Sequence, residues 1–379
     1  MFFDITEEHE MIRKAARDFA REELLPGVIE RDEHQIFPAE QMKKLGELGF
    51  LGMMVDPKYN GAGLDTLSYV LVMEELSKID ASASVVVSVN NSLVCYGLEA
   101  YGSEFQKEKY LKPLAAGECI GAFCLSEPEA GSDATSQRTT AIDMGDHYLL
   151  NGTKNWITNG INARYYLVMA QTDVDKGHRG INCLIVEEGM EGFVKGAKEN
   201  KMGIRGSDTC SLQFTDVKVP KENRIGEDGF GFKFAMKTLS GGRIGIAAQA
   251  LGIAQGAYEL AKEYSKQRKA FGKPIHEHQA IAFKLADMAT RIEAARLLIY
   301  KAAWMKDQGM NYDQASAMAK LYASETAMWV TTEAVQVHGG YGYVKEYHVE
   351  RLMRDAKITQ IYEGTSEVQR IVISRSVLD

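Results

Sequence analysis

The pattern of hydrophobic and polar positions changes twice along the chain, and its first part is helical. Apolar residues recur at helical spacing at Ile12, Ala16 and Phe19, and Met42, Leu45 and Leu48 repeat that spacing further along. A proline at position 57 and the Gly-Ala-Gly segment 61–63 interrupt the pattern. The sequence therefore predicts a domain of short α-helices over residues 1–117.

Between residues 118 and 231 the pattern becomes one of short apolar or alternating runs. Such runs occupy 148–150, 165–170, 181–186 and 211–214, and Gly, Asp and Asn residues separate them. Runs of this length between turn-forming residues are typical of β-strands. We expect a β domain of sandwich or barrel type here.

The remaining residues, 232–379, contain a single proline, Pro274, so long helices can run without interruption. Apolar residues step by three and four from Ile281 to Ala302, which marks one buried stripe. Asp313 fits the N-cap of a further helix that reaches Gln336. Three or four such helices predict an antiparallel bundle, so the fold class is α+β, with a C-terminal four-helix-type bundle.

Length, charge and cysteine usage narrow the class of protein. With 379 residues the chain exceeds the size of one usual core, which predicts two or three packed domains. Its formal charge of −8, without a basic run, argues against nucleic acid as a partner. Five cysteines without a Cys-x-x-Cys pair favour a reduced compartment over a disulfide framework.

Neither a membrane span nor a metal site is expected. No apolar stretch is expected to reach the roughly 20 residues that span a bilayer, and residues 1–4 carry no basic segment typical of a signal peptide. We therefore expect a soluble, cytoplasmic protein. His276 and His278 form the closest histidine pair, but they lie without cysteines or a carboxylate cluster nearby, so no metal is predicted.

One carboxylate near the C-terminus stands in a setting that suits a catalytic base. Glu363 lies between Tyr362 and Gly364, and a glycine disfavours the helix interior, so the backbone there leaves a helix or admits a close neighbour. The alternative is a helix C-cap with a solvated glutamate, because glycines commonly cap helices.

Two upstream segments offer candidate binding groups. Residues 123–134 form an irregular stretch rich in turn formers, whose free N–H groups either hold a planar cofactor or satisfy a surface turn. Residues 151–160 begin with a predicted turn at Asn151-Gly152 and continue through Trp156. A tryptophan is more often part of a core than the wall of a cofactor site.

Together these three segments resemble the acyl-CoA dehydrogenase family over essentially the whole chain, in the family's order. The resemblance is strongest to the short-chain (butyryl-CoA) members, through the segments 88–93, 202–207 and 242–252, which read SVNNSL, MGIRGS and GRIGIAAQALG. It implies an N-terminal helical domain, a middle β domain and a C-terminal bundle. It also implies FAD as cofactor, a homotetramer, and electron-transfer flavoprotein as the electron acceptor.

The implied reaction is the α,β-dehydrogenation of a short-chain acyl-CoA to the trans-2-enoyl-CoA. Glu363 would abstract the α-proton, and a hydride would pass from the β carbon to FAD. In the family, the ribityl chain of FAD and the backbone N–H of the base stabilise the developing enolate. Some branched-chain members place the base at the position of Gly242, on a helix that we expect to begin near Ser240, and a glycine cannot serve.

The resemblance also assigns ligand contacts to individual residues. FAD contacts are expected at Phe123, Leu125, Ser126, Gly131, Ser132, Trp156, Ile157, Thr158, Arg268, Phe271, Gln279, Gln336, Val337, Gly339, Gly340, Thr365, Ser366 and Glu367. Of these, Arg268, Gln279 and the segment 336–340 would reach the FAD of a neighbouring subunit, although Arg268 could equally be a solvated helix end.

Acyl-CoA contacts are expected at Ser132, Ser240, Arg243, Tyr362 and Gly364. Close relatives carry Asp at the position of Ser240, so the sequence leaves that contact in doubt while Arg243 keeps its charge.

Several other functions compete with this reading. The enzyme could act on medium- or branched-chain acyl-CoAs, or react with oxygen as an acyl-CoA oxidase does, although oxidases usually have longer chains. A member similar to nitroalkane oxidase would carry Asp where Glu363 stands. A scaffold with the family fold but no turnover would be colourless.

Overall fold

The computed structural model describes residues 5–378, so the start of the chain, on which the signal-peptide expectation rests, lies outside the described residues. The first part of the described chain is helical. Its helices are α1 (Glu7–Phe19), α2 (Val28–Glu33), α3 (Ala39–Glu47), α4 (Thr66–Ser77), α5 (Ala81–Ser88), α6 (Tyr96–Tyr101), α7 (Glu104–Gln106) and α8 (Lys112–Ala115). Thr6 caps α1, since its side chain accepts a hydrogen bond from the backbone N–H of His9.

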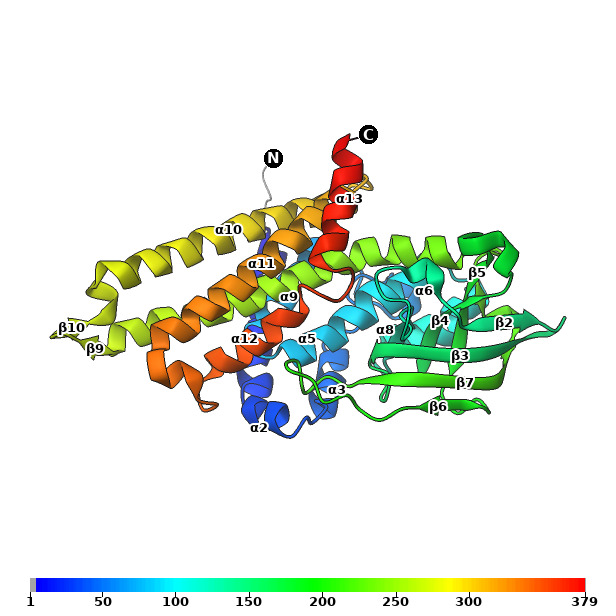
Figure 1. The fold of residues 1–379 in the computed structure, drawn as a ribbon, viewed down its shortest axis with the longest axis horizontal. Coiled ribbons are helices and arrows are strands. Elements are labelled where there is room, and N and C mark those ends of the chain that lie inside the picture. Colours follow the sequence, from blue (N-terminus) through cyan, green and yellow to red (C-terminus); the bar gives the residue numbers. More distant parts are fainter. Residues whose placement is uncertain (1–4, 379) are drawn as a thin grey trace.

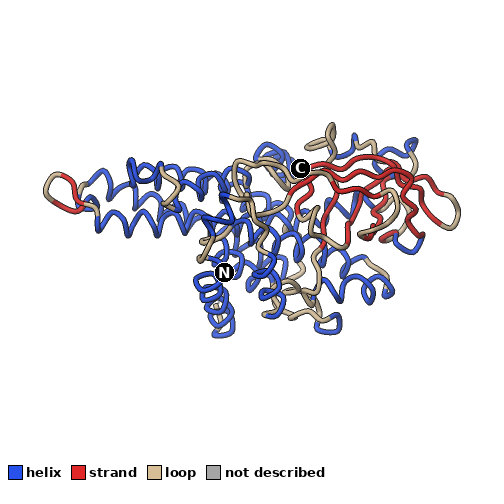
Figure 2. Tube along the Cα trace, turned by 90° about the horizontal axis from the view of Figure 1, so that it is seen from below, coloured by secondary structure: helices blue, strands red, loops and turns tan. Residues whose placement is uncertain are grey.

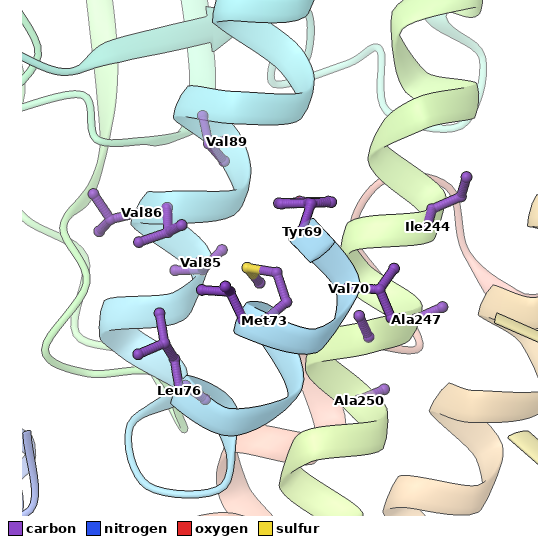
Figure 3. Close-up of a cluster of buried hydrophobic side chains, with 14 of the residues drawn as sticks. Tyr69, Val70, Met73, Leu76, Val85, Val86, Val89, Ile244, Ala247 and Ala250 are labelled. Carbon is purple, nitrogen blue, oxygen red and sulfur yellow. The ribbon is translucent and has the colours of Figure 1, made fainter. Parts of the chain in front are cut away.

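Helix α4 is buried on all sides and lies between α5 and the long helix α9 (Gly231–Gln267), as Figure 3 shows. Tyr69 and Val70 of α4 are buried, as are Val86 of α5 and Ile244 of α9. This apolar cluster fixes α9 against the N-terminal helices, and the segment of α9 that it holds includes Gly242.

One helical stretch has the length and apolar composition of a membrane span, which was not expected from the sequence. This stretch is Ala81–Tyr101. However, 94% of its most apolar window is buried inside the protein, so its composition reflects a place in the core.

The middle part of the chain forms one mixed eight-stranded sheet. Its strands are β1 (Gly121–Cys124), β2 (Thr140–Asp143), β3 (His147–Thr158), β4 (Tyr165–Gln171), β5 (Ile181–Glu187), β6 (Phe193–Lys195), β7 (Thr209–Pro220) and β8 (Arg224–Ile225). The order is β6-β7-β3-β2-β4-β5-β8, and β1 pairs in parallel with β4.

Both faces of this sheet are covered, which explains why β4 and β5 are so apolar. Tyr165 and Leu167 of β4 belong to the helical core, whereas Tyr166 and Val168 belong to a second core that the sheet encloses. Alternate residues of a strand point to opposite faces, so a fully buried strand reads as a continuous apolar run.

The predicted turn at Asn151-Gly152 is wrong, because both residues lie inside β3. The register with β7 shifts between Leu150 and Gly152, which marks a β-bulge. Gly152 has φ of 144°, and an added Cβ would lie 2.6 Å from Thr139 Oγ1, so this position favours glycine.

The C-terminal part is a bundle of long helices. Its elements are α9, a short hairpin of β9 (Lys269–Ala270) and β10 (Lys273–Pro274), α10 (Gln279–Asp307), α11 (Asp313–His338), α12 (His348–Ile358) and α13 (Ser366–Leu378). Two boundaries differ from expectation. Helix α9 begins at Gly231 and has Ser240 in its interior, and Asp313 is the first residue of α11 while Tyr312 is its N-cap.

Small residues form the buried face of α11. Ala319, Ala323 and Ala327 are fully buried, whereas Leu321 is partly exposed and Tyr322 is 38% exposed. Small side chains allow two helix backbones to approach closely, and α11 packs mainly against the Gly- and Ala-rich α9.

The molecule is elongated along α9. Figures 1 and 2 both show the sheet at one end and the β9–β10 hairpin at the opposite end. Helix α9 spans 37 residues and, at about 1.5 Å per residue, connects the two ends over roughly 55 Å.

Candidate active site

The candidate base lies in the loop between α12 and α13. Glu363 has φ of 51° and Gly364 has φ of 91°, so both are in the left-handed region. The Glu363 residue is partly exposed, but its Oε2 atom is buried and has no hydrogen-bond partner in the described part of the chain. A solvated glutamate at a helix C-cap is therefore not what the structure contains.

Glycine at position 242 makes room for this carboxylate. A Cβ added to Gly242 would overlap Glu363 Oε2 and would lie 2.7 Å from Leu93 Cδ2. The side chain of Glu363 thus projects to the position on α9 where some branched-chain members carry their base.

Burial sets the ionisation of Glu363. It raises the pKa of this carboxyl to about 7, while the positive charges of Lys320 and Arg243 oppose the rise. A carboxyl with a pKa near neutral pH can accept a proton without being fully protonated at rest.

Two buried side chains from neighbouring helices form hydrogen bonds to the backbone of the loop that carries Glu363. Lys320 Nζ on α11 donates a hydrogen bond to the Gly364 carbonyl at 2.6 Å. Gln369 Nε2 on α13 donates to the Gly364 carbonyl at 2.9 Å and to the Glu363 carbonyl at 3.2 Å. Sequence reasoning missed both residues, although a lysine among alanines in a predicted helix was a usable signal for Lys320.

Polar side chains surround the base on its other sides. The Tyr362 hydroxyl donates a hydrogen bond to Gln249 Oε1, and burial raises the pKa of Tyr362. The Tyr69 hydroxyl lies 3.0 Å from Ser88 Oγ and occupies the space beside Gly245, one turn along α9 from Gly242. These residues limit the room next to Glu363, and Tyr69 and Gln249 were not predicted.

A cavity of about 600 Å³ borders the same stretch of α9. Ser240 and Arg243 line it together with Tyr96, Tyr312 and Asp313. Arg243 is only 7% exposed, its Nε atom has no hydrogen-bond partner, and burial lowers its pKa. The Ser240 hydroxyl donates to the Met236 carbonyl of its own helix at 3.3 Å, which leaves it a weaker candidate for binding a ligand.

Trp156 is on the surface, although a tryptophan is more often part of a protein core. It is 61% exposed, has φ of 61°, and lies where the register of β3 shifts between Lys154 and Ile157. The bulge directs Trp156 outward while Ile157 is 2% exposed in the core of the sheet, so any ligand contact of Ile157 involves its backbone. Thr158, partly exposed, ends the strand.

The segment beside Trp156 is partly strand and partly loop. Phe123 belongs to β1 and stacks on Phe234 of α9, eight residues or about 12 Å before Gly242. Leu125 and Ser126 follow, and the Ser126 carbonyl accepts a hydrogen bond from the N–H of Asn155 at 2.9 Å. Gly131 and Ser132 are exposed.

A buried ion pair anchors residues 125–127 to strand β3. Lys154 Nζ donates to Glu127 Oε1 at 2.7 Å and to the Leu125 carbonyl at 3.1 Å. Glu127 also accepts hydrogen bonds from the N–H groups of Arg138 and Thr139. The network fixes the loop relative to β3, and an exposed ring next to a fixed loop fits a planar cofactor.

A second group of predicted residues lies at the far end of the bundle, and we call it the tip cluster. It consists of Arg268, Phe271, Gln279, Gln336, Gly339 and Gly340, all exposed. Tyr264 stacks on His338 at 4.3 Å and Arg268 lies 5.9 Å from the Tyr341 ring, which brings the ends of α9 and α11 together. Val337 is buried, so its side chain packs in the core.

The tip cluster is remote from the base. Residues 242 and 268 are separated by 26 positions along α9, about 39 Å, and Figure 1 places the hairpin at the opposite end from the sheet. One side chain cannot bridge that distance, so the structure divides the predicted cofactor residues into two groups.

The last predicted contacts start α13. Thr365 Oγ1 accepts a hydrogen bond from the Val368 N–H, which is the bond of an N-cap. Ser366 is buried and its hydroxyl has no partner, whereas Glu367 is exposed.

The structure also bears on metal binding, and it contains a second cavity. Between residues 5 and 378, no group of three or more His, Cys, Asp or Glu side chains could hold a metal ion. His276 Nδ1 and His278 Nε2 instead lie within hydrogen-bond distance of the carbonyls of Ser265 and Ala270. An open cavity of about 650 Å³ beside α2 is lined by Leu25, Val28 and neighbouring residues.

Comparisons with known proteins cover the whole chain. Models of the acyl-CoA dehydrogenase N-terminal, middle and C-terminal domains match residues 6–118, 122–217 and 229–378. The "Acyl-CoA dehydrogenase, short-chain specific" of Clostridium acetobutylicum is 52% identical, with 100% of both chains covered.

Solved structures agree with the sequence comparisons. Butyryl-CoA dehydrogenase from Megasphaera elsdenii superimposes with a TM-score of 0.99 at 52% identity, with 100% of both chains covered. A chain from a structure of the electron transferring flavoprotein of Acidaminococcus fermentans gives 0.99 at 53% identity, also over 100% of both. The predicted α+β fold is confirmed, and the chain belongs to the acyl-CoA dehydrogenase family of FAD-dependent oxidoreductases.

Proposed function

We propose that this enzyme dehydrogenates a short-chain acyl-CoA such as butyryl-CoA to the trans-2-enoyl-CoA, with Glu363 as the base that removes the α-proton. The observation that carries this proposal is the state of the carboxylate. Its Oε2 atom is buried without a partner, and burial raises its pKa to about 7.

A carboxylate cannot deprotonate the carbon next to a thioester unaided, because that carbon is a far weaker acid. The backbone N–H of Glu363 would donate a hydrogen bond to the thioester carbonyl and stabilise the negative charge that develops there. The hydrogen bonds from Lys320 and Gln369 to the Glu363–Gly364 loop would fix the position of this N–H relative to the carboxylate. FAD, when bound, supplies the acceptor for the hydride that leaves the β carbon.

The cavity beside α9 would bind the rest of the substrate. Arg243 supplies a buried positive charge that suits the phosphate groups of CoA, and its Nε atom lacks a hydrogen-bond partner among residues 5–378. Tyr362 and Gly364 would contact the acyl group beside the base. Ser240 lines the cavity and Ser132 lies on the exposed loop, so both would contribute weaker contacts.

Residues at both ends of the molecule would bind FAD. The flavin ring would be held by Phe123, Leu125, Ser126, Gly131, Ser132, Trp156, Ile157 and Thr158. The nucleotide beside the base would be contacted by Thr365, Ser366 and Glu367. The tip cluster and Val337 would contact FAD in another copy of the chain, since α9 separates them from Glu363 by about 39 Å.

This division supports a homotetramer in which subunits complete one another's cofactor sites. Exposed apolar side chains on the bundle support the same proposal: Phe271 is 96% exposed, Phe283 58% and Leu297 50%.

The remaining expectations also stand as proposals. The names of the relatives support a short-chain substrate and an electron-transfer flavoprotein as acceptor. The five free cysteines support a cytoplasmic location. Domain boundaries at 1–117, 118–231 and 232–379 are supported by the end of α8 at Ala115, the start of β1 at Gly121 and the start of α9 at Gly231.

An anaerobic titration of the purified holoenzyme tests the function. Acyl-CoAs of four to sixteen carbons would be added, and bleaching of the flavin absorbance would be recorded together with the enoyl-CoA formed. We expect fastest reduction by the shortest substrates. Reduction by none of them, or a preparation without flavin that FAD cannot reconstitute, would refute the proposal.

A further inference from the structure

The resemblance to the acyl-CoA dehydrogenase family assigned no role to the buried lysine Lys320, although this residue lies next to the proposed base. It is on α11 with 0% exposure, and its Nζ donates a hydrogen bond of 2.6 Å to the Gly364 carbonyl. Burying an ammonium group is costly unless the site uses or compensates the charge. The other fully buried lysine in a comparable network, Lys154, is compensated by the carboxylate of Glu127 at 2.7 Å.

The carbonyl that Lys320 binds belongs to a strained segment. Glu363 has φ of 51°, a conformation that residues other than glycine rarely adopt, and Gly364 follows with φ of 91°. Such a conformation persists only when its surroundings hold it. Lys320 from α11 and Gln369 from α13 do so, because each donates to the Gly364 carbonyl.

The charge of Lys320 acts on Glu363 as well. Charged and titratable groups face the carboxylate from several elements: Lys320 on α11, Arg243 on α9, and the hydroxyls of Tyr69 on α4 and Tyr362 in its own loop. Among the positive charges, Lys320 has the largest favourable effect on the carboxylate, and Arg243 comes second.

The groups around Lys320 itself have opposing effects. Glu363 and the exposed Glu367 favour its charged form, while Arg243 disfavours it. Burial is the largest influence and lowers the pKa of Lys320 to about 8. The ammonium and the carboxylate therefore titrate in adjacent ranges, and each stabilises the charged form of the other.

We propose that Lys320 is a positioning residue for α-proton abstraction: its ammonium holds the Gly364 carbonyl, and so the Glu363 loop, and its positive charge keeps the base ionised. This inference rests on the proposed function, in which Glu363 is the base. It assigns to one side chain both the geometry of the base and its readiness to accept a proton.

Two neutral variants separate the two effects. Lys320→Met removes both the charge and the donor, whereas Lys320→Gln removes the charge but keeps an N–H donor. Lys320→Arg restores the charge. Lys306→Met is the matched control, because burial lowers the pKa of Lys306 to about 8 as well, although the residue is partly exposed. The carboxylates that act on Lys306 are Asp307 and Glu99.

The main measurement is the pH dependence of flavin reduction by butyryl-CoA in the holoenzyme under single-turnover conditions. For Lys320→Met we expect reduction about tenfold slower at pH 7, with the acidic limb of the profile displaced upward by about one pH unit. Lys320→Gln should show the same displacement with a faster plateau. Lys320→Arg and Lys306→Met should keep the parent limb.

A second readout does not depend on turnover. Infrared titration of the carboxyl band that disappears in Glu363→Gln reports the ionisation of the base directly, and this titration should move upward in both neutral variants. FAD content and thermal unfolding of each variant show whether it is folded.

The outcomes separate this inference from the proposed function. If both neutral variants keep the parent limb, with rates within about twofold of the parent, Lys320 has no such role. If instead Glu363→Gln reduces its flavin at close to the parent rate, the proposed base is wrong, whatever the Lys320 variants do.

Discussion

The base and the tip cluster lie at opposite ends of α9, and they differ in how complete each is within one chain. Glu363 Oε2 is buried, and side chains from α9, α11 and α13 surround its loop. Phe271, at the other end, is 96% exposed, and Arg268 is exposed beside it. The base is thus positioned by one chain, whereas the tip cluster presents its side chains outward.

Because of this difference, substitutions in the two regions should affect different properties of the enzyme. Changes near Glu363 should alter the chemical step without changing the oligomer, because the contacts there are internal. Changes in the tip cluster should alter cofactor retention and assembly, because we propose that those exposed side chains contact the FAD of another copy of the chain. The predictions below test that separation, beginning with the largest effect.

Glu363→Gln should reduce flavin reduction by butyryl-CoA by about 10²- to 10⁴-fold, roughly 3 to 5 kcal/mol in activation free energy. The amide keeps the shape of the side chain and the backbone N–H, so FAD content and acyl-CoA binding should stay close to those of the parent. Stopped-flow absorbance measures the rate. A variant within about tenfold of the parent rate would show that another residue is the base.

Gly242→Ala should slow reduction by about 10²-fold. The added Cβ would overlap Glu363 Oε2 and crowd Leu93 Cδ2 at 2.7 Å, so the carboxylate must move away from its working position. Gly241→Ala, at the preceding residue of α9, adds the same methyl group where the nearest atom, Lys306 Nζ, is 3.8 Å away, and it serves as the control for rate. Equal rates for both variants would contradict the assigned geometry.

Arg268→Ala should weaken FAD retention by about tenfold, the loss expected for one charge-assisted hydrogen bond to a phosphate. Reduction by butyryl-CoA should recover when excess FAD is added, because the base is untouched. Lys269→Ala, also exposed in the hairpin, is the matched control. Dialysis followed by flavin absorbance measures retention, and equal retention in the two variants would remove Arg268 from the site.

The last expected effect is on stability, and it changes neither the base's position nor FAD retention. The folded state raises the pKa of Glu363 from 4.5 to about 7, so it binds this proton more tightly than the unfolded chain does. The contribution of Glu363 to the free energy of unfolding therefore falls as the pH rises from about 4.5 to 7. Relative to the parent, Glu363→Gln should gain about 2 kcal/mol between pH 5 and pH 8.

Glu367→Gln provides a control of opposite sign for that measurement. Its backbone and Thr365 lower the pKa of the Glu367 carboxyl, so its stabilising contribution is present above pH about 4.5 and is lost as the pH falls. Thermal unfolding measured from below pH 4.5 up to pH 8 compares the two variants. A parallel response of both to pH would mean that Glu363 is not buried in solution as it is in the structure.

Much of the fold follows from local patterns. The spacing of Ile12, Ala16 and Phe19 predicted α1, the runs at 165–170 and 181–186 predicted β4 and β5, and the absence of proline predicted the long helices of the bundle. Periodicity carries this information because one buried face is enough to define a helix or a strand. Periodicity predicted the boundaries of the elements less well. At α9, for example, a helix start was expected near Ser240, which lies inside a helix that begins at Gly231.

The local sequence also misled where a residue type usually has another role. Asn151-Gly152 is a common turn pair but lies in a bulge of β3, and Trp156, of a type usually found in cores, is on the surface. A bulge depends on how two strands pair, and the partner strand β7 lies about 60 residues away in the sequence. No pattern within a short window contains that information.

The sequence by itself determined the order of helical and β regions and the family, and through the family it singled out Glu363 for the chemistry. Only the tertiary structure decided that Lys320, Gln369 and Gly242, drawn from three different helices, meet around the loop of Glu363. It also placed Arg268 about 39 Å from Gly242 along α9. The physical reason is that burial and electrostatic interaction depend on distance in space. Periodicity records which face of an element is buried, but the side chains that share a buried site come together only when the elements pack.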